Sequence, residues 1–441
     1  MGSRRGRRQR RSEPREVTIE GMSHEGRGIA HVNGKTVFVF GALQGETVLM
    51  QVLKSNRKFD QATTLEVLEA SPQRITPRCA AFQVCGGCSL QHLDNDDQVE
   101  MKQDSLLQMM EHAGLQPAEL LAPLRAGAWG YRRKARLGVK YVAKKGRVLV
   151  GFRERNTPYI ADMQRCEVLL PEVGHRLELL SNLIGNLDAR ALIPQIEVAA
   201  DAQQVQLIFR HLQPLSERDR ELLVAFARAH DYQVMLQPGG PDTVQCLYPE
   251  QQELYLQPRG PEGPSIGFNA LDFVQVNSDI NQQMVAQALG FLELQPDHRA
   301  LDLFCGLGNF TLPMAEGCAR VTGVEADQAM LSRARASALA NAIDNTEYHC
   351  ADLTQPDPQM AWMRQQYDCI LLDPPRSGAL EMAQLIGQFD ARRIVYVSCQ
   401  PSSLVRDAAI ICGQGYSLSR LGVMDMFPQT AHVEAMAVFQ R

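Results

Sequence analysis

The sequence lacks any long apolar run. Its longest apolar stretches, such as 369–372 and 394–397, are far shorter than the roughly 20 residues that a membrane-spanning helix needs. No apolar stretch follows the arginine-rich residues 1–15, so these residues do not form a secretory signal. The 11 cysteines are an odd number and are not spaced like a secreted disulfide framework. We therefore predict a cytoplasmic protein that does not enter a membrane, and we expect a monomer.

The sequence also lacks an excess of positive charge. Its net charge of −5 does not by itself suggest a protein that binds nucleic acid. The distribution of charge points the other way. Residues 1–15 hold seven Arg and one Glu, and residues 131–155 hold ten Lys or Arg and one Glu. Since a phosphate backbone responds to local fields, we predict a disordered basic tail over 1–14 and a basic strand pair within 131–155 that faces nucleic acid. Tyr131, Tyr141 and Phe152 lie among these charges and could stack on bases.

The pattern of apolar residues changes along the chain and divides it into three regions. Residues 16–70 read as short strands separated by Gly and Asn turns, which is typical of a small β-barrel, such as an oligonucleotide-binding fold. Residues 128–260 mix strands and helices, which predicts an α+β insert. From residue 266 onward, apolar strands alternate with helical stretches, which predicts a doubly wound α/β domain.

A glycine-rich turn follows the first strand of this α/β domain, in RALDLFCGLGNFTLPMA (299–315). Gly306 and Gly308 allow a close approach to a ligand, but Thr311 replaces the third glycine of a dinucleotide fingerprint. Glu325 ends the second strand, where a carboxylate can bind ribose hydroxyls, and Asp352 ends the third, where it could hold an adenine amino group. These three positions are similar to the class I methyltransferase arrangement for S-adenosylmethionine.

Two further strand ends carry candidate catalytic residues. Asp373 ends the fourth strand, and Cys399 ends the fifth beside a helix that begins near Pro401, so the helix N-terminus should lower the thiol pKa. A thiolate that adds to C6 of uracil makes C5 nucleophilic toward a methyl donor, and a base must then remove the C5 proton. Glu434 is the candidate base, because burial would raise its pKa, and His432 is the rival.

A cysteine cluster lies between the first two regions. Cys79, Cys85 and Cys88 occur within ten residues, and Gly86 and Gly87 would let the chain wrap closely around a metal centre. Cys166 is the best candidate for a fourth ligand. Four thiolates suit zinc or a 4Fe–4S cluster, and the spacing alone does not choose between them.

The segments LDLFCGLGNF, LLDPPRSG, YVSCQPSSLVRD and DMFPQTAHVEAMAVF resemble the RNA uridine-C5 methyltransferase family. With the cysteine cluster and the N-terminal β-region, the chain is most similar to its bacterial 23S ribosomal RNA branch. The resemblance implies methylation of one uridine of 23S ribosomal RNA, with Cys399 as nucleophile and Glu434 as base. It also implies a 4Fe–4S cluster on Cys79, Cys85, Cys88 and Cys166. The cofactor is then S-adenosyl-L-methionine, bound by Gln275, Phe304, Asn309, Glu325, Asp352 and Asp373.

The same resemblance predicts the domains of the chain. They are a TRAM domain, which is an oligonucleotide-binding-like barrel (15–70), a central α+β domain with the iron–sulfur cluster (71–95 and 126–265) and a class I (Rossmann-like) α/β methyltransferase domain (96–125 and 266–441). One departure is DPPR where close relatives are expected to have DPAR, which leaves Asp373 unchanged.

Three rival functions remain open at this stage. A cytosine-C5 RNA methyltransferase would usually carry a second cysteine near Arg376, and none is present there. A non-catalytic RNA-binding iron–sulfur protein would be expected to lose Cys399 or Glu434, and both are present. A zinc-dependent RNA-binding module would lack the brown colour of an iron–sulfur cluster.

Overall fold

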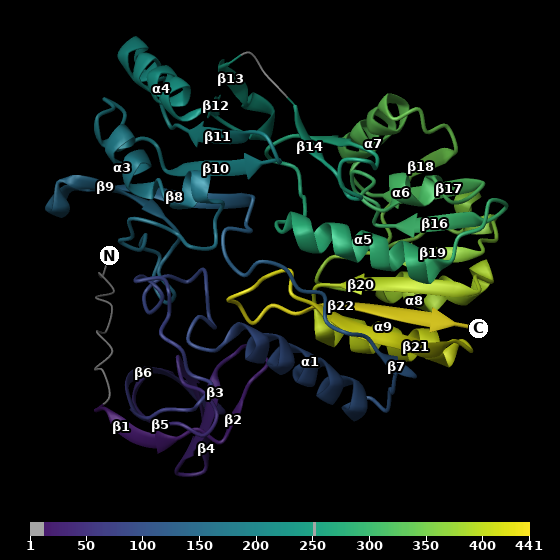
Figure 1. Ribbon diagram of the computed structural model, residues 1–441, viewed down its shortest axis with the longest axis horizontal. Helices are drawn as coiled ribbons and strands as arrows, with labels where there is room; N and C mark the ends of the chain where they lie inside the picture. The colour runs from purple at the N-terminus through teal and green to yellow at the C-terminus, as the bar shows by residue number, and fades with distance from the viewer. Residues whose placement is uncertain (1–12, 250–252) are drawn as a thin grey trace, which may run out of the picture. The chain divides into compact units, whose positions relative to one another are not determined.

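The computed structural model describes residues 13–249 and 253–441, so most of the predicted tail over 1–14 lies outside the described residues. The contacts divide the chain into two compact units. The first contains the residues up to Ser105 together with Gln429–Ala431, and the second contains Leu106–Pro428 and His432–Arg441. Figure 1 shows the elements of both. No described helix is long and apolar enough to cross a membrane.

The first unit is built on one curled six-stranded sheet, in the order β1-β5-β6-β4-β3-β2. Its core consists of side chains that alternate along the strands; in β4, for example, Val37 and Val39 are buried while their neighbours are less so. The short strands predicted within 16–70 are confirmed, for example over Gly28–Val32 and Lys35–Phe40. The strands are β1 (Arg15–Thr18), β2 (Gly21–Met22), β3 (Gly28–Val32), β4 (Lys35–Phe40), β5 (Thr47–Ser55) and β6 (Phe59–Glu69).

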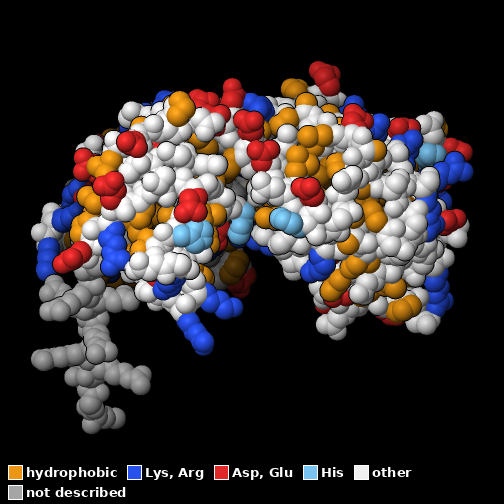
Figure 2. All heavy atoms as spheres, turned by 90° about the horizontal axis from the view of Figure 1, so that it is seen from below, with side chains coloured by type: hydrophobic (Ala, Val, Ile, Leu, Met, Phe, Trp, Pro, Cys, Tyr) orange, Lys and Arg blue, Asp and Glu red, His pale blue; other side chains and the backbone are white. Residues whose placement is uncertain are grey.

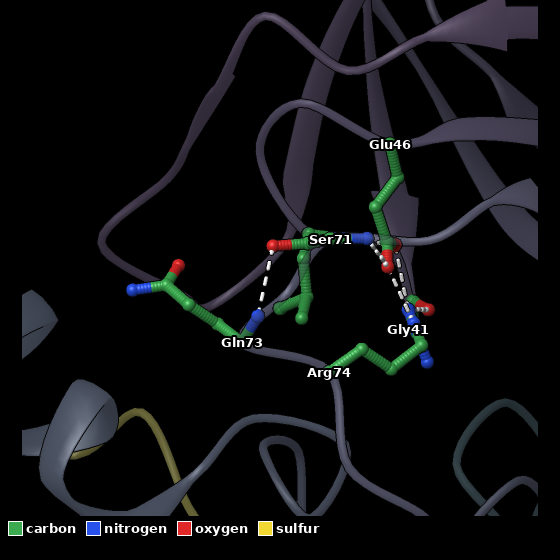
Figure 3. Close-up of polar contacts among 6 residues, drawn as sticks. Gly41, Glu46, Ser71, Gln73 and Arg74 are labelled. Atoms are coloured by element: carbon green, nitrogen blue, oxygen red, sulfur yellow. Dashed lines mark hydrogen bonds and ion pairs between the residues drawn. The ribbon is translucent and has the colours of Figure 1, made fainter.

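A buried ion pair ties the chain that follows β6 to this sheet (Figure 3). The Glu46 carboxylate is completely buried and accepts hydrogen bonds from Nε of Arg74 at 2.5 Å and Nη2 of Arg74 at 2.7 Å. It also accepts from the backbone N–H of Ser71, and Arg74 donates to the carbonyl of Gly41. Burial alone would raise the pKa of Glu46, but the bonds from Arg74, Leu43 and Ser71 outweigh it and lower the pKa.

The second unit contains a central sheet of six strands, in the order β13-β12-β11-β10-β8-β9. Helix α4 (Glu217–His230) contacts β12 and β13, and α3 (Leu177–Gly185) contacts β9. The Ser216 side chain caps α4 by accepting from the N–H of Asp219. The strands are β8 (Lys134–Val142), β9 (Arg147–Gly151), β10 (Gln195–Ala200), β11 (Val205–Arg210), β12 (Tyr232–Gln237) and β13 (Gln245–Tyr248).

An eight-stranded sheet in the same unit has the order β18-β17-β16-β19-β20-β22-β21-β7. Strands β16 to β20 are parallel to one another, and β22 is antiparallel to both of its neighbours. The doubly wound α/β prediction is therefore confirmed. The strands are β7 (Glu119–Leu120), β16 (Arg299–Leu303), β17 (Arg320–Glu325), β18 (Thr346–Cys350), β19 (Cys369–Leu372), β20 (Arg393–Ser398), β21 (Ser417–Met424) and β22 (Glu434–Gln440).

Helices cover both faces of this sheet. Val395 and Val397 of β20 pack in one core with residues of α5, whereas Tyr396, between them, donates its hydroxyl hydrogen to Asp407 of α9. Because successive strand side chains point to opposite faces, α5 and α9 lie on opposite sides. The other helices and strands of this unit are α2 (Pro171–Gly174), β14 (Leu254–Leu256), β15 (Ile266–Phe268), α5 (Ser278–Leu292), α6 (Thr311–Ala315), α7 (Gln328–Ala340), α8 (Leu380–Leu385) and α9 (Pro401–Gly413). Helix α1 (Asn95–His112) has residues in both units.

The face drawn in Figure 2 carries basic and acidic side chains interspersed with one another. This distribution agrees with the small net charge of −5. Any attraction of nucleic acid to that face must therefore come from local groups of residues rather than from one broad positive field.

Candidate active site

The carboxyl ends of the parallel strands meet at one edge of the eight-stranded sheet. Leu303 of β16 pairs with Leu372 of β19, and Leu372 pairs with Tyr396 of β20. Ligands of open α/β sheets bind at this edge. The registers therefore bring the loops after β16, β19 and β20 side by side, as the sequence predicted.

The antiparallel strand β22 brings the candidate base to the candidate nucleophile. Ser398, the last residue of β20, pairs with Ala435 of β22. Cys399 follows Ser398 and Glu434 precedes Ala435, so the two lie opposite each other at the next position of the same strand pair. Residues that are 35 positions apart in the sequence thus become neighbours in the fold.

The Cys399 thiol is mainly surrounded by groups that disfavour its ionisation. Burial raises its pKa to about 11, and the negative charges of Glu434 and Asp373 act in the same direction. The sequence predicted a lowered pKa from the N-terminus of α9, and this prediction is wrong because burial and the two carboxylates outweigh the helix dipole.

Arg376 is the cation that opposes these carboxylates. Its charge lowers the pKa of Cys399 and also that of Glu434. Arg376 lies in the exposed loop after β19, close enough to act electrostatically on both residues. Sequence reasoning used Arg376 only as a position without cysteine and missed this role; the DPPR sequence beside a predicted strand end was the available signal.

Glu434 has the properties expected of a buried base. Its side chain is 5% exposed, and burial raises its pKa to about 8, with the charge of Asp373 contributing in the same direction. The predicted rise in pKa is confirmed. The rival, His432, is exposed, and its ring contacts that of Phe427 at 5.5 Å between centroids. Burial beside the thiol therefore favours Glu434 over His432.

The turn after β16 has the backbone conformation of a ligand-binding loop. Phe304, Gly306 and Gly308 all have positive φ angles, of 64°, 55° and 94°. A Cβ at Gly308 would lie 2.6 Å from Cδ1 of Leu312, so only glycine fits there. The N–H of Gly306 donates to the Glu325 carboxylate at 3.2 Å, which joins two of the predicted cofactor positions.

Asp302 is a buried carboxyl group at this edge that the sequence reasoning missed. It accepts a hydrogen bond from the Thr311 hydroxyl at 2.5 Å, which explains why Thr311 stands where a dinucleotide fingerprint has glycine. Burial raises its pKa to about 7, and burial raises that of Asp373 to about 7 as well. Oδ1 of Asp302 has no hydrogen-bond partner among the described residues. An acidic residue inside an apolar strand was the signal that could have found it.

The other predicted cofactor contacts lie around the same loops. Gln275 is half-buried in the segment before α5. The Asn309 side chain exchanges two hydrogen bonds with Asn281 of α5, at 2.9 and 3.0 Å. Asp352 is exposed after β18, and hydrogen bonds from the side chain and the backbone of Thr354 lower its pKa. These facts do not test the roles that the sequence predicted for the three residues.

The predicted metal ligands belong to different units. Cys79, Cys85 and Cys88 lie in the first unit, whereas Cys166 is buried in the second. The N–H of Gly87 donates to Sγ of Cys85 at 3.4 Å, a bond that favours a thiolate. In residues 13–249 and 253–441, no three His, Cys, Asp or Glu side chains form a group that could hold a metal ion.

The basic segment forms the predicted strand pair, since β8 pairs antiparallel with β9. Several of its charges are used within the protein: Arg147 pairs with Asp162, and Arg136 pairs with Glu197. Tyr131 is 9% exposed and donates to the carbonyl of Pro428, so its ring is not available for stacking on a base.

Comparison with known proteins identifies two matching family models. Residues 267–441 match the model described as tRNA (uracil-5-)-methyltransferase, and residues 8–65 match that of the TRAM domain. The second match supports an RNA-binding type of fold for the curled sheet of the first unit.

Curated relatives match along nearly the whole chain. One from Alcanivorax borkumensis is 49% identical over 430 residues, which cover 97% of both chains. One from Alkalilimnicola ehrlichii is 50% identical over 441 residues, with 99% of both chains covered. Both are named 23S rRNA (uracil(1939)-C(5))-methyltransferase RlmD.

A solved structure shares the fold. The tRNA (uracil-54, C5)-methyltransferase of Pyrococcus abyssi, solved with S-adenosyl-L-homocysteine, is 20% identical and has a TM-score of 0.75, and the match covers 96% of this chain and 100% of that one. At this identity the likeness establishes the architecture alone.

Proposed function

The chain belongs to the family of 23S rRNA (uracil-C5)-methyltransferases, and we propose from this that it methylates carbon 5 of the uracil at position 1939 of 23S rRNA. The methyl donor is S-adenosyl-L-methionine. The observation that supports the proposal is the pairing of β20 with β22, since Ser398 opposite Ala435 makes Cys399 and Glu434 neighbours at the two strand ends. A nucleophile and a base on adjacent strand ends are what addition to a pyrimidine ring and later removal of a proton require.

Cys399 begins the reaction as a nucleophile. Its thiolate forms a bond from Sγ to C6 of the uracil, and the electron pair of the C5–C6 double bond moves toward C5 and O4. When bound, S-adenosyl-L-methionine would supply an electrophilic methyl group to carbon 5 and would leave as S-adenosyl-L-homocysteine, so that carbon 5 carries both a methyl group and a hydrogen. Because the thiol pKa is about 11, its proton must be removed before or during the addition.

Glu434 completes the reaction as a base. Its carboxylate takes the proton from C5, the electron pair of the C–H bond restores the C5–C6 double bond, and the bond from C6 to Sγ breaks. With a pKa of about 8, Glu434 is a stronger base than an exposed carboxylate. It must lose its own proton before this step.

Arg376 supports a uracil substrate. Its positive charge faces the thiol and Glu434, and it lowers the pKa of both. A cation at this position favours a thiolate and would stabilise the negative charge that develops on O4 in the adduct. A cytosine-C5 enzyme would instead be expected to have a cysteine near this position.

The residues at the sheet edge fit a positively charged methyl donor. Three carboxyl groups, those of Asp302, Glu325 and Asp373, act on one another electrostatically, and Oδ1 of buried Asp302 has no partner in the described part of the chain. Gln275, Phe304, Asn309, Glu325, Asp352 and Asp373 are proposed to hold the donor. Glu325 would then bind the ribose hydroxyls, and Gly306 leaves room for close approach.

A covalent complex tests this mechanism. RNA with 5-fluorouracil at the target position should form a stable adduct after methyl transfer, because fluorine cannot be removed as a proton. We expect mass spectrometry of a protease digest to find the nucleotide on the peptide that contains Cys399. Cys399→Ala should abolish methyl transfer while RNA binding is retained, and normal turnover by this variant would contradict the mechanism.

We further propose that Cys79, Cys85, Cys88 and Cys166 bind a 4Fe–4S cluster. The donor chemistry fits, since all four are thiol side chains, three lie within ten residues, and Cys85 accepts a hydrogen bond from Gly87. When bound, the cluster would link two segments of the chain, and no redox step is needed for methyl transfer. The protein purified without oxygen should be brown, with about four iron and four sulfide per chain. Cys85→Ser should bleach it, and stoichiometric zinc in place of iron would overturn the assignment.

We also propose four regions along the chain. They are a basic tail (1–14), a TRAM domain (15–70), a central domain (71–95 and 126–265) and a catalytic domain (96–125 and 266–441). A cytoplasmic location follows from a ribosomal RNA substrate. The monomeric state can be measured by sedimentation.

A further inference from the structure

A cavity of about 700 Å³ opens in the second unit beside the N-terminus of α5. Its lining includes Arg133, Arg176, Asp201, Tyr232, Asn277 and Asp279. Neither Cys399, Glu434 nor any proposed cofactor contact lines it, so the cavity is separate from the active site. Its volume is in the range of pockets that hold small molecules or single nucleotides.

Arg133 gives the cavity an unused hydrogen-bond donor. Its side chain is 9% exposed, and burial lowers the pKa of its guanidinium, while the charges of Asp201 and Asp279 act in the opposite direction. Its backbone N–H donates to the carbonyl of Val276, which fixes the residue in place. No described side chain accepts a hydrogen bond from the guanidinium. A buried cation without such an acceptor is costly, and a ligand with acceptor atoms would remove that cost.

Asn277 provides a second, independent donor. It caps α5, and its Oδ1 accepts from the N–H of Ile280 at 3.4 Å. The side chain is 1% exposed, and its Nδ2 group has no partner in the described residues. The first N–H groups of this 15-residue helix also lack helical acceptors, as in any helix. Arg133, Asn277 and the N-terminus of α5 therefore line the same cavity.

Carboxylates at the edge of the cavity make a phosphate a poor ligand. Glu172, Asp201, Asp231 and Asp279 all line it, against Arg133 and Arg176. Asp201 is held by backbone N–H groups of Gln203, Gln204 and Tyr255, so its position is fixed. A neutral ligand that has acceptors for Arg133 and Asn277 and donors for a carboxylate fits this distribution better than an anion.

Arg176 provides a flat surface beside these polar groups. Its guanidinium lies over the ring of Tyr232 with 5.6 Å between its carbon and the ring centroid, and its Nη1 donates to the Tyr232 hydroxyl at 3.2 Å. Fixed guanidinium planes are surfaces on which unstacked bases of RNA stack.

We propose that this cavity binds a second base of the substrate RNA, a purine that is turned out of its stack. Guanine matches the polar groups best, because Arg133 can donate to O6 and N7 while a carboxylate accepts from the amino group. The inference rests on the proposed function, since it requires RNA as the substrate. It adds a site that selects the RNA through a base other than the methylated uracil.

The first test compares two charge-removing variants in steady-state methylation of an rRNA fragment. Arg133→Gln should raise KM for the RNA about tenfold, the value of one lost bidentate contact, with little change in kcat or in KM for S-adenosylmethionine. Arg210→Gln is the matched control, because Arg210 is exposed at the end of β11 and does not line the cavity. Equal effects of the two variants would show a general loss of charge and would overturn the proposal.

The second test identifies the base. Fragments with one abasic nucleotide at a time are assayed with the unmodified protein and with Arg133→Gln. One purine position, distinct from the target, should raise KM for the unmodified protein about tenfold but have little effect on the variant. If no position shows this dependence on Arg133, the cavity does not bind a base.

A third measurement does not depend on the stability of the Arg133 variant. A photoreactive amino acid at Gln203, an exposed residue of the lining, should cross-link to the same purine. Scattered cross-links would contradict the proposal. Failure of the proposed function would look different, because the unmodified protein would then neither methylate the fragment nor form the Cys399 adduct.

Discussion

Protonation of two side chains should control the rate of the reaction. Cys399, with a pKa of about 11, and Glu434, with a pKa of about 8, must both be deprotonated, and both are mainly protonated at neutral pH before substrates bind. We expect kcat to increase with pH between about pH 6 and about pH 9. The measurement is single-turnover methyl transfer with saturating RNA and cofactor across this range. A rate that is constant over the range would show that bound substrates had already removed the proton.

Glu434 should reduce the stability of the folded protein as pH rises. Its pKa in the fold, about 8, is above the ordinary value of 4.5, so the unfolded chain loses this proton first. The free energy of unfolding therefore falls between these two values, by about 1.4 kcal/mol per pH unit at most. Glu434→Gln should thus gain stability relative to the unmodified protein up to about pH 8, although it is expected to be inactive.

Urea unfolding at about pH 6 and about pH 9 checks this expectation. Glu381→Gln on α8, outside the site, is the control, and the difference between its stability and that of the unmodified protein should not depend on pH. If the free energies of unfolding of the two variants change with pH in the same way, burial of Glu434 is not the cause of the pH dependence.

Single residues differ in how far the sequence predicts them. Cys399 could be identified because it stands where a strand pattern stops, and Glu434 because it lies among apolar residues, where burial raises the pKa of a carboxyl group. The pKa of Cys399 was predicted in the wrong direction, since burial and the charges of Asp373 and Glu434 arise only from the fold. Asp302 was missed for the same reason: its burial beside Thr311 is a tertiary fact.

At the level of elements, contacts with α9 fix the position of the loop that follows β19. The carboxylate of Asp407 accepts from the N–H of Ala379 at 2.7 Å and from the hydroxyl of Tyr396 at 2.6 Å. Gly378, at the end of this loop, has a φ of +78°, and a Cβ there would lie 2.6 Å from Oδ2 of Asp407. The loop carries Arg376, so its packing on α9 positions a charge beside the thiol.

Gly378→Ala should therefore impair both stability and activity. The close contact and the positive φ should cost about 1–3 kcal/mol of stability, and displacement of Arg376 should lower kcat about tenfold. Gly413→Ala at the end of α9 is the control, since its Cβ would have nothing within 4 Å. Thermal unfolding measures the stability of the two variants, and methylation assays measure kcat. A Gly378→Ala protein that is as stable and as active as Gly413→Ala would contradict this role of the loop.

Regular elements of the α/β region could be predicted closely. Strand β16 and helix α9 begin where the sequence indicated, at Arg299 and Pro401, because an apolar run and a proline mark them. After the loop that carries Arg376, the helical stretch is divided into α8 and a 3-10 turn over 386–389. Pairings between strands distant in the sequence, such as β22 between β20 and β21, have no signal in local periodicity.

At the scale of the whole molecule, a buried ion pair stabilises the first unit. In the first unit, removal of Arg74 would leave the fully buried carboxylate of Glu46 without its ion pair. Arg74→Met should lower the free energy of unfolding by about 3 kcal/mol. Lys35→Met, which removes the more exposed pair with Asp60, should cost about 1 kcal/mol or less. Urea unfolding of the two variants measures the difference, and equal losses would show that burial of Glu46 is unimportant.

The division of the chain into units was harder to predict than its elements. Local patterns separate a β-rich beginning from an α/β end, and both are present. They do not reveal that Gln429–Ala431, close to the C-terminus, belong to the first unit. There Gln98 and Gln429 bond to each other twice, and the carbonyl of Gln429 accepts from the N–H groups of Ser89 and Leu90.

This membership has a consequence for biosynthesis. The polypeptide leaves the ribosome from its N-terminus, yet the first unit needs Gln429–Ala431, which are made more than 300 residues after Ser105. Until they arrive, the side chain of Gln98 and the amides of Ser89 and Leu90 must bond to water. The nascent N-terminal portion can therefore collapse early but cannot reach its final state before residues 429–431 have been synthesised, and a fragment that ends at Ser105 should be less stable than the same residues within the longer chain.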